Sequence, residues 1–290
     1  ESAFTKVGNL SNGIDLKLNS IICDESIYLI AIGNIVPHRV CGFSGGYKIL
    51  LPGLTCQSTM NEIHFESAKY PSEEILGFAK NPVREYINEV HHKRPIDFLI
   101  NTVLDGNSRI ISICHGDPIS SQYQGSKIAS DVYGVNISKQ MDTVITDCAP
   151  ESIDFWVCAK ALTNTKSFVK KGGNLVVLAP CNEGISPVHE KELLRYGYRK
   201  PKEIRAMVED GEIEREHLLE ASHLSHIGEV LNHANVYIIT DNKDMQKLEE
   251  FDFHIIESKE LSTVLSQIVK HDDNLGLVSR GSEILPKRKD

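Results

Sequence analysis

The sequence predicts an α/β protein with two Rossmann-like parallel-sheet domains and an active site in the cleft between them. Short apolar runs typical of strands alternate with segments of helical periodicity between residues 27 and 278. Their spacing allows a crossover helix between successive parallel strands. The length of 290 residues fits one or two domains. We place the first domain at 1–135 and the second at 136–290, with the last strand or tail able to return to the first domain.

In the first domain, the apolar run 27–35 predicts a buried parallel strand. A short helix carrying His64 follows, with Thr59 as its N-cap. Apolar residues at helical spacing predict one helix over about 72–92. Strands at 96–103 and 109–114 and a helix at 119–132 complete the domain. The turn from His115 to Pro118 is expected where a parallel strand meets a helix, so His115 is a candidate cleft residue.

The alternation restarts at residue 142. We expect strands at 143–147, 174–179, 236–240, 253–256 and 275–278. Helices are expected at 153–170, 187–196, 201–209, 216–233, 244–249 and 261–269. The pair Gly172-Gly173 is typical of a helix C-cap and predicts the end of the first of these helices.

Composition narrows the function classes. The chain is 41% hydrophobic and 24% charged, as globular domains are. A formal net charge of −9 argues against a nucleic-acid partner. No run of eighteen apolar residues and no signal-peptide pattern is present, so we expect no membrane partner and a cytoplasmic protein. Seven scattered cysteines without a CxxC pair predict reduced thiols.

The most informative segment is 35–64. It contains His38, a glycine-rich turn, Lys48, a Pro-Gly turn and His64. Gly42, Gly45 and Gly46 are expected to adopt positive φ, which lets backbone N–H groups face an anion. The GxxxxGK[ST] spacing of a P-loop is absent.

This segment resembles the nickel-dependent lactate racemase family, whose pattern reads roughly PHxxxGFSGGxKxxxPG…TxxxNH. The matching residues are Pro37-His38, Gly42-Phe43-Ser44-Gly45-Gly46, Lys48, Pro52-Gly53, Thr59 and His64. His38 and Lys48 are ten residues apart (48 − 38), and Lys48 and His64 are sixteen apart (64 − 48). Several residue types at fixed offsets make this resemblance specific.

The resemblance implies a racemase or epimerase of a 2-hydroxy acid that works by hydride transfer. Lys48 would hold pyridinium-3,5-bisthiocarboxylic acid mononucleotide as a thioamide, and this nickel-pincer nucleotide binds nickel through two sulfurs and a ring carbon. His64 would complete the nickel coordination, and His38 would be the general base. The turn residues Gly42, Ser44, Gly45 and Gly46 would bind the cofactor phosphate. The implied partners are a small 2-hydroxy acid and cofactor-maturation proteins.

A second matching position is Lys160, ten residues after Pro150, which the resemblance assigns to the substrate carboxylate. Two neighbours depart from the family pattern. Val157 stands where the family has glutamine, and Cys148-Ala149 replaces a Gly-Gly turn. Because losing a polar substrate contact changes which acid fits, these departures argue against lactate itself. The resemblance as a whole implies lactate or a related 2-hydroxy acid as substrate.

Other interpretations stay open. His38 with Cys41 is a weak zinc signal, since no zinc-like spacing supplies four ligands. His217, His223, His226 and His233 are expected on a solvated, partly interfacial helix. The family's N-terminal stretch with a second catalytic histidine has no counterpart, so we expect no racemisation by this chain alone. The alternatives are an inactive cofactor- or metal-binding module and, more weakly, a dehydrogenase, although the GxGxxG fingerprint is missing.

Overall fold

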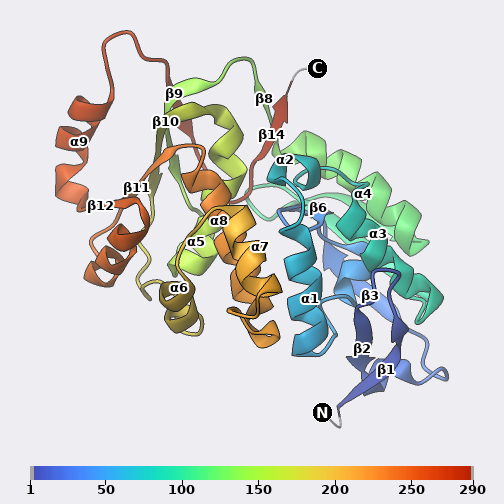
Figure 1. Cartoon of the computed structure of the whole chain (residues 1–290). Helices are drawn as coiled ribbons and strands as arrows, with labels where there is room; N and C mark the ends of the chain where they lie inside the picture. The colour runs from blue at the N-terminus through green and yellow to red at the C-terminus, as the bar shows by residue number, and fades with distance from the viewer. Residues whose placement is uncertain (1–2, 289–290) are drawn as a thin grey trace. The chain divides into compact units, whose positions relative to one another are not determined.

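The computed structural model describes residues 3–288, which form two compact units (Figure 1). The first unit runs to Gly134 and includes Glu214–Ser222; the second comprises Val135–Ile213 and the residues from His223 onward. Each unit combines sheets with helices, so the α/β class is confirmed. Within residues 3–288, no helix has the length and apolarity needed to cross a bilayer.

The first unit is built on a three-stranded sheet of order β3-β6-β7. β3 (Ile30–Asn34) runs parallel to β6 (Phe98–Leu104), whereas β7 (Ile110–Gly116) is antiparallel to β6. Helix α4 (Pro118–Tyr133) packs on β6 and β7. The turn at His115 therefore follows an antiparallel strand, contrary to the prediction. A hairpin of β1 (Phe4–Asn9) and β2 (Asp15–Asn19), blue in Figure 1, was not predicted.

The segment that carries the motif folds as short elements. β4 (Pro37–His38) and β5 (Gly42–Phe43) form a two-stranded ladder, followed by the 3-10 turn η2 (Gly46–Ile49) and helix α1 (Gln57–Ser67). The predicted cap of α1 is wrong, because Cys56 occupies the N-cap position. The Thr59 hydroxyl instead donates to the carbonyl of Asp15 at 2.7 Å and ties α1 to β2.

The helix predicted over 72–92 is wrong as a single element. The chain forms α2 (Ser72–Ile75), α3 (Pro82–Asn88) and the 3-10 turn η3 (Glu89–His92). Gly77 has φ +82° and interrupts the periodicity. The Asn81 side chain then accepts the Arg84 N–H as a new N-cap, and Pro82 is the first helical residue.

The second unit contains the predicted parallel sheet. Its strands are β9 (Met141–Asp147), β10 (Val169–Leu178), β11 (Asn235–Ile239), β12 (Phe253–Ile256) and β13 (Leu275–Val278). Their order is β12-β11-β10-β9-β13, and all neighbours are parallel. Val144, Val176 and Ile238 are buried, as strands covered on both faces require.

The helices of this part of the chain are α5 (Phe155–Thr165), α6 (Glu190–Tyr196), α7 (Pro201–Glu209), α8 (Leu218–Leu231) and α9 (Leu261–Ile268). The 3-10 turns of the second unit are η4 (Lys166–Phe168), η6 (Lys243–Phe251) and η7 (Ser258–Glu260), whereas η1 (Ser20–Cys23) and η5 (Arg215–His217) lie in the first unit. β8 (Gly134–Ile137) pairs with β14 (Leu285–Arg288). The predicted C-cap at Gly172-Gly173 is wrong, because both glycines lie inside β10 where its register with β9 shifts.

Candidate functional site

The motif forms a tight loop in the first unit. The β4–β5 ladder places His38 opposite Gly42. The Ser44 N–H donates to the Val36 carbonyl at 2.9 Å. The Ser44 hydroxyl donates to the Asn34 carbonyl at 2.8 Å and accepts the Val36 N–H at 2.9 Å. Ser44 thus closes the loop through its own backbone and side chain.

The glycines adopt the expected positive φ, at +80° for Gly42, +76° for Gly45 and +60° for Gly46. A Cβ on Gly42 would lie 2.0 Å from the Phe78 carbonyl oxygen, so the loop packs directly on protein backbone there. The Gly46 N–H donates to Asn101 Oδ1 at 2.9 Å. Two N–H groups of the turn, those of Ser44 and Gly46, are therefore used within the protein, and phosphate binding by Gly42, Ser44, Gly45 and Gly46 stays a prediction.

A buried arginine holds the loop from inside the unit. Arg84 of α3 is fully buried, and its guanidinium donates to the carbonyls of Gly45, at 3.2 Å, and Phe43. The same group lies 3.4 Å from Cys41 Sγ. Buried carbonyls require hydrogen-bond partners, and Arg84 supplies them to the carbonyls of the loop and so holds the loop in place. No feature of the sequence around Arg84 indicated this role.

His38 is oriented by its own loop. The Val40 N–H donates to His38 Nδ1 at 3.2 Å, and Cys41 Sγ lies 3.6 Å from the same nitrogen. Because Nδ1 accepts a hydrogen bond, the neutral ring carries its hydrogen on Nε2. His38 is thus arranged as a hydrogen-bond donor through Nε2, and its role as general base stays a prediction.

His64 has the chemistry of a metal ligand. Its Nδ1 lies 2.8 Å from the Met60 carbonyl one helical turn earlier, which puts the hydrogen on Nδ1 and a lone pair on Nε2. Burial lowers the pKa of His64 to about 4, the Met60 bond opposes this shift, and the charges of Lys48 and Arg39 lower the pKa further. The imidazole is therefore neutral near pH 7, the form that binds metals.

The charge of Lys48, sixteen residues earlier in the sequence, is one of the effects that lower the pKa of His64. Lys48 is half-buried on η2, and His64 is half-buried on α1. Across residues 3–288, no group of three or more His, Cys, Asp or Glu side chains is arranged to hold a metal ion. One neutral imidazole, with a lysine near enough for its charge to lower the pKa of the ring, would suit a cofactor that brings its own metal ligands and needs one covalent anchor and one protein ligand.

Lys160 lies on α5 in the second unit. Its Nζ is 2.6 Å from Glu151 Oε1, in a pair whose side chains are each about one-third exposed or more. Such a pair contributes little to stability, so its partner can be exchanged for another carboxylate. Its role in substrate binding stays a prediction.

An aromatic stack one turn before Lys160 escaped the sequence interpretation. The ring of Trp156 stacks between His189, with centroids 4.0 Å apart, and His223, at 4.3 Å. Trp156 and Lys160 share one face of α5 because they are four residues apart. His223 and His226 are fully buried, so the predicted solvated helix is wrong for these two, whereas His217 and His233 are half-buried. The four-residue spacing of Trp156 and Lys160 could have indicated that the two side chains lie on the same face of the helix.

Three cysteines gather in the same unit. Cys158 Sγ lies 3.0 Å from Cys148 Sγ and 3.5 Å from Cys181 Sγ, and all three are buried. Sulfur–hydrogen bonding with Cys158 and burial raise the pKa of Cys148. All seven cysteines are free thiols in the structure, and the reduced state stays a prediction.

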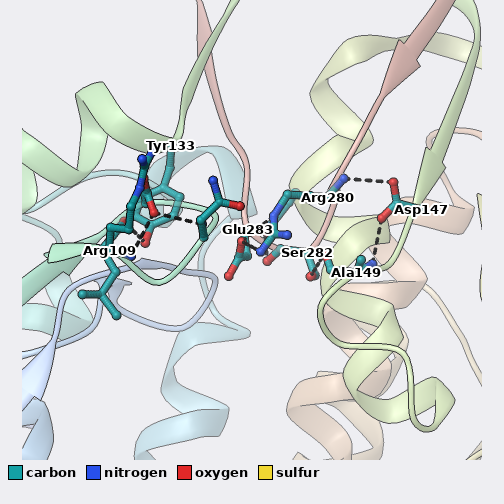
Figure 2. A network of polar contacts seen from close by, with 11 residues as sticks. Arg109, Tyr133, Asp147, Ala149, Arg280, Ser282 and Glu283 are labelled. Carbon is teal, nitrogen blue, oxygen red and sulfur yellow. Dashed lines mark hydrogen bonds and ion pairs between the residues drawn. The ribbon is translucent and has the colours of Figure 1, made fainter. Parts of the chain in front are cut away.

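The edge where parallel sheets bind ligands is filled by the chain itself in the second unit. The strand order reverses between β9 and β13, and such switch points hold ligands in α/β proteins. Here Asp147 accepts the N–H groups of Ala149, at 2.9 Å, and Arg280, at 3.0 Å (Figure 2). Ser282 Oγ donates to the Ala149 carbonyl at 2.8 Å. The loop after β13 is therefore hydrogen-bonded to the chain at the end of β9, at the switch point.

Comparison with known proteins shows which proteins this chain resembles. Residues 1–75 match the family model of the lactate racemase N-terminal domain. The chain is 26% identical to lactate racemase of Thermoanaerobacterium thermosaccharolyticum over 98% of its own length and 66% of the relative. It is 26% identical to lactate racemase of Lactiplantibacillus plantarum over 63% of its own length and 44% of the relative. The chain thus spans less than two-thirds of the length of these relatives.

Solved structures share the fold. Lactate racemase apoprotein from Thermoanaerobacterium thermosaccharolyticum superposes with a TM-score of 0.86 at 22% identity, over 99% of this chain and 69% of that chain. A protein from Thermotoga maritima superposes with a TM-score of 0.78 at 18% identity, over 99% of this chain and 76% of that one. The chain is therefore similar to lactate racemase along almost its whole length, and its first 75 residues match the model of the lactate racemase N-terminal domain.

Proposed function

We propose that this chain is the cofactor-holding part of an isomerase that interconverts the two configurations of a 2-hydroxy acid, lactate or a close relative. Its similarity to lactate racemases over 98% of its length supports this reaction class. The observation that carries the proposal is the neutral, metal-competent His64, whose pKa is lowered in part by the charge of Lys48. The expectation of a cytoplasmic protein that meets cofactor-maturation proteins stays a prediction.

A nickel-pincer nucleotide would supply a hydride acceptor for the substrate Cα. In the proposal, the Lys48 amine anchors this group covalently and His64 Nε2 binds its nickel. Bond formation at Lys48 removes a positive charge, which relieves one of the effects that lower the pKa of His64. Neutral His64 is the ligand form throughout the physiological pH range.

His38 handles the substrate hydroxyl in this proposal. As general base, the neutral ring would carry its hydrogen on Nδ1 and take the substrate hydroxyl proton onto the Nε2 lone pair, which gives an imidazolium. In the reverse step this imidazolium returns the same proton from Nε2 to the substrate oxygen as the hydroxy acid forms. Cys41 Sγ, 3.6 Å from Nδ1, is then the acceptor for the Nδ1 hydrogen. Lys160 binds the substrate carboxylate, which replaces Glu151 as the partner of its amine.

The second candidate function is a module that binds the cofactor or a metal without turnover. It is favoured by the coverage of the relatives, since the chain spans 66% of the Thermoanaerobacterium lactate racemase. A catalytic contribution from the uncovered part would then be missing. The racemase proposal makes the same prediction for the isolated chain, so the two differ only once that part is supplied.

The test is a chiral assay on protein produced together with cofactor-making proteins. We expect single enantiomers of lactate and related acids to racemise when the uncovered part of a relative is supplied, and not with the isolated chain. Lys48→Ala should abolish the conversion, and Lys202→Ala, on the exposed start of α7, should not. A cofactor-loaded, complemented protein without activity would establish the binding module instead.

A further inference from the structure

One face of the β3-β6-β7 sheet in the first unit is apolar and exposed. Along β3, Ala31 is buried, whereas Ile30 and Ile32 are 54% and 69% exposed. Ile113 of β7 is also 54% exposed. Because side chains alternate between the two faces of a strand, Ile30 and Ile32 point to the face opposite Ala31. Large isoleucines at this exposure are unusual for a sheet that faces water.

The strand register joins these side chains into one surface. Ile32 lies beside Ile100 of β6, and Ile113 lies opposite Thr102 of β6. The rings of Phe98 and His115 are 6.0 Å apart across β6 and β7. The exposed face, defined here by Ile30, Ile32, Phe98, Ile100 and Ile113, therefore spans all three strands. A contiguous apolar patch of this kind marks an interaction surface.

The other face of the same sheet is covered by protein. Leu99 and Val103 of β6 and Cys114 of β7 are buried there. Helix α4 packs on these two strands. Sheets with parallel strand pairs are normally covered on both faces, because each face is apolar. The first unit thus has one complete layer of helix and one apolar face that a second layer would cover.

We propose that the exposed face docks a further polypeptide segment, equivalent to the part of lactate racemase that has no counterpart in these 290 residues. The match to the Thermoanaerobacterium enzyme uses 98% of this chain and 66% of the relative, so about a third of the relative lies outside it. The three-stranded sheet and its one-sided cover leave room for such a layer, whereas the five-stranded sheet of the second unit has buried strands. The inference rests on the relationship to lactate racemase that the proposed function also uses.

The experiment measures binding, so its failure is distinct from failure of the proposed catalysis. The chain is co-expressed with a tagged segment comprising the uncovered part of the Thermoanaerobacterium lactate racemase, and co-purified protein is quantified. The face variant is Ile32→Lys with Ile113→Lys. The matched control is Leu277→Lys, which places a charge at a position 76% exposed on β13 of the second unit. Hydrogen–deuterium exchange locates the contact, and sedimentation velocity gives the mass of the chain alone.

We expect an equimolar complex with the wild-type chain and with Leu277→Lys, slower exchange in β3, β6 and β7, and capture of the face variant reduced more than about tenfold. Equal capture of all three proteins, or capture of none, would overturn the proposal. A wild-type chain that sediments alone as a dimer, with the dimer lost in the face variant, would overturn it too, since a second copy would then be the occupant.

Discussion

At the residue scale, His64 links the fold to the proposed chemistry. Its helix supplies the carbonyl of Met60 that fixes the Nδ1 hydrogen, and its surroundings keep the ring neutral. The spacing of the sequence motif singled out His64 and Lys48, and in the structure the charge of Lys48 lowers the pKa of His64. The orientation of His38 was not predictable, because it depends on a backbone N–H two residues away.

The low pKa of His64 predicts a pH dependence of stability. The unfolded chain takes up a proton near pH 6.5, whereas folded His64 does so only near pH 4. The contribution of neutral His64 to the free energy of unfolding is therefore fully present above pH 6.5 and is lost as the pH falls toward 4. It amounts to about 3 kcal/mol of the free energy of unfolding. Urea unfolding of the cofactor-free protein at pH 7 and pH 4.5 measures it, and His64→Gln should flatten this dependence. An unchanged slope in that variant would contradict the assignment.

At the element scale, short elements and their caps were hardest to predict. Residues 72–92 have helical periodicity, yet Gly77 and the Asn81-Pro82 cap divide them, because local hydrogen bonds outweigh the apolar pattern. The parallel sheet of the second unit was predictable, since apolar runs at crossover spacing admit few topologies. Arg84 escaped prediction because its carbonyl partners lie about forty residues away in sequence.

The packing of the glycine loop predicts a large effect of Gly42→Ala. Gly42 has φ +80°, and its added Cβ would lie 2.0 Å from the Phe78 carbonyl oxygen. We expect a loss of about 3 kcal/mol or more in the free energy of unfolding, measured in urea. Gly13→Ala is the matched control. Gly13 has φ +89° but nothing within 4 Å of the added Cβ, so its loss should be about 1 kcal/mol. Equal losses in the two variants would disprove close packing at Gly42.

At the scale of the whole molecule, the parallel sheet of the second unit has its own chain at the switch point. The loop containing Arg280 and Ser282 fills the switch point. A cavity of about 650 Å³ lies at the ends of β10 and β11, but Asp241 and Asp244 line it and oppose a pyrophosphate. We therefore predict that millimolar NAD⁺ changes the unfolding midpoint by less than about 1 °C in a thermal shift assay. Saturable stabilisation by several degrees would revive the dehydrogenase interpretation.

The central claim is that the first unit holds a nickel cofactor on Lys48 with His64 as the metal ligand. Intact-protein mass with nickel analysis, on protein produced together with cofactor-making proteins, tests it most directly. The account predicts a covalent adduct on Lys48 with stoichiometric nickel. Both should be lost in Lys48→Ala, whereas His64→Ala should keep the adduct and lose most of the nickel. Unmodified Lys48 without nickel, under conditions that load the Thermoanaerobacterium lactate racemase, would contradict the account.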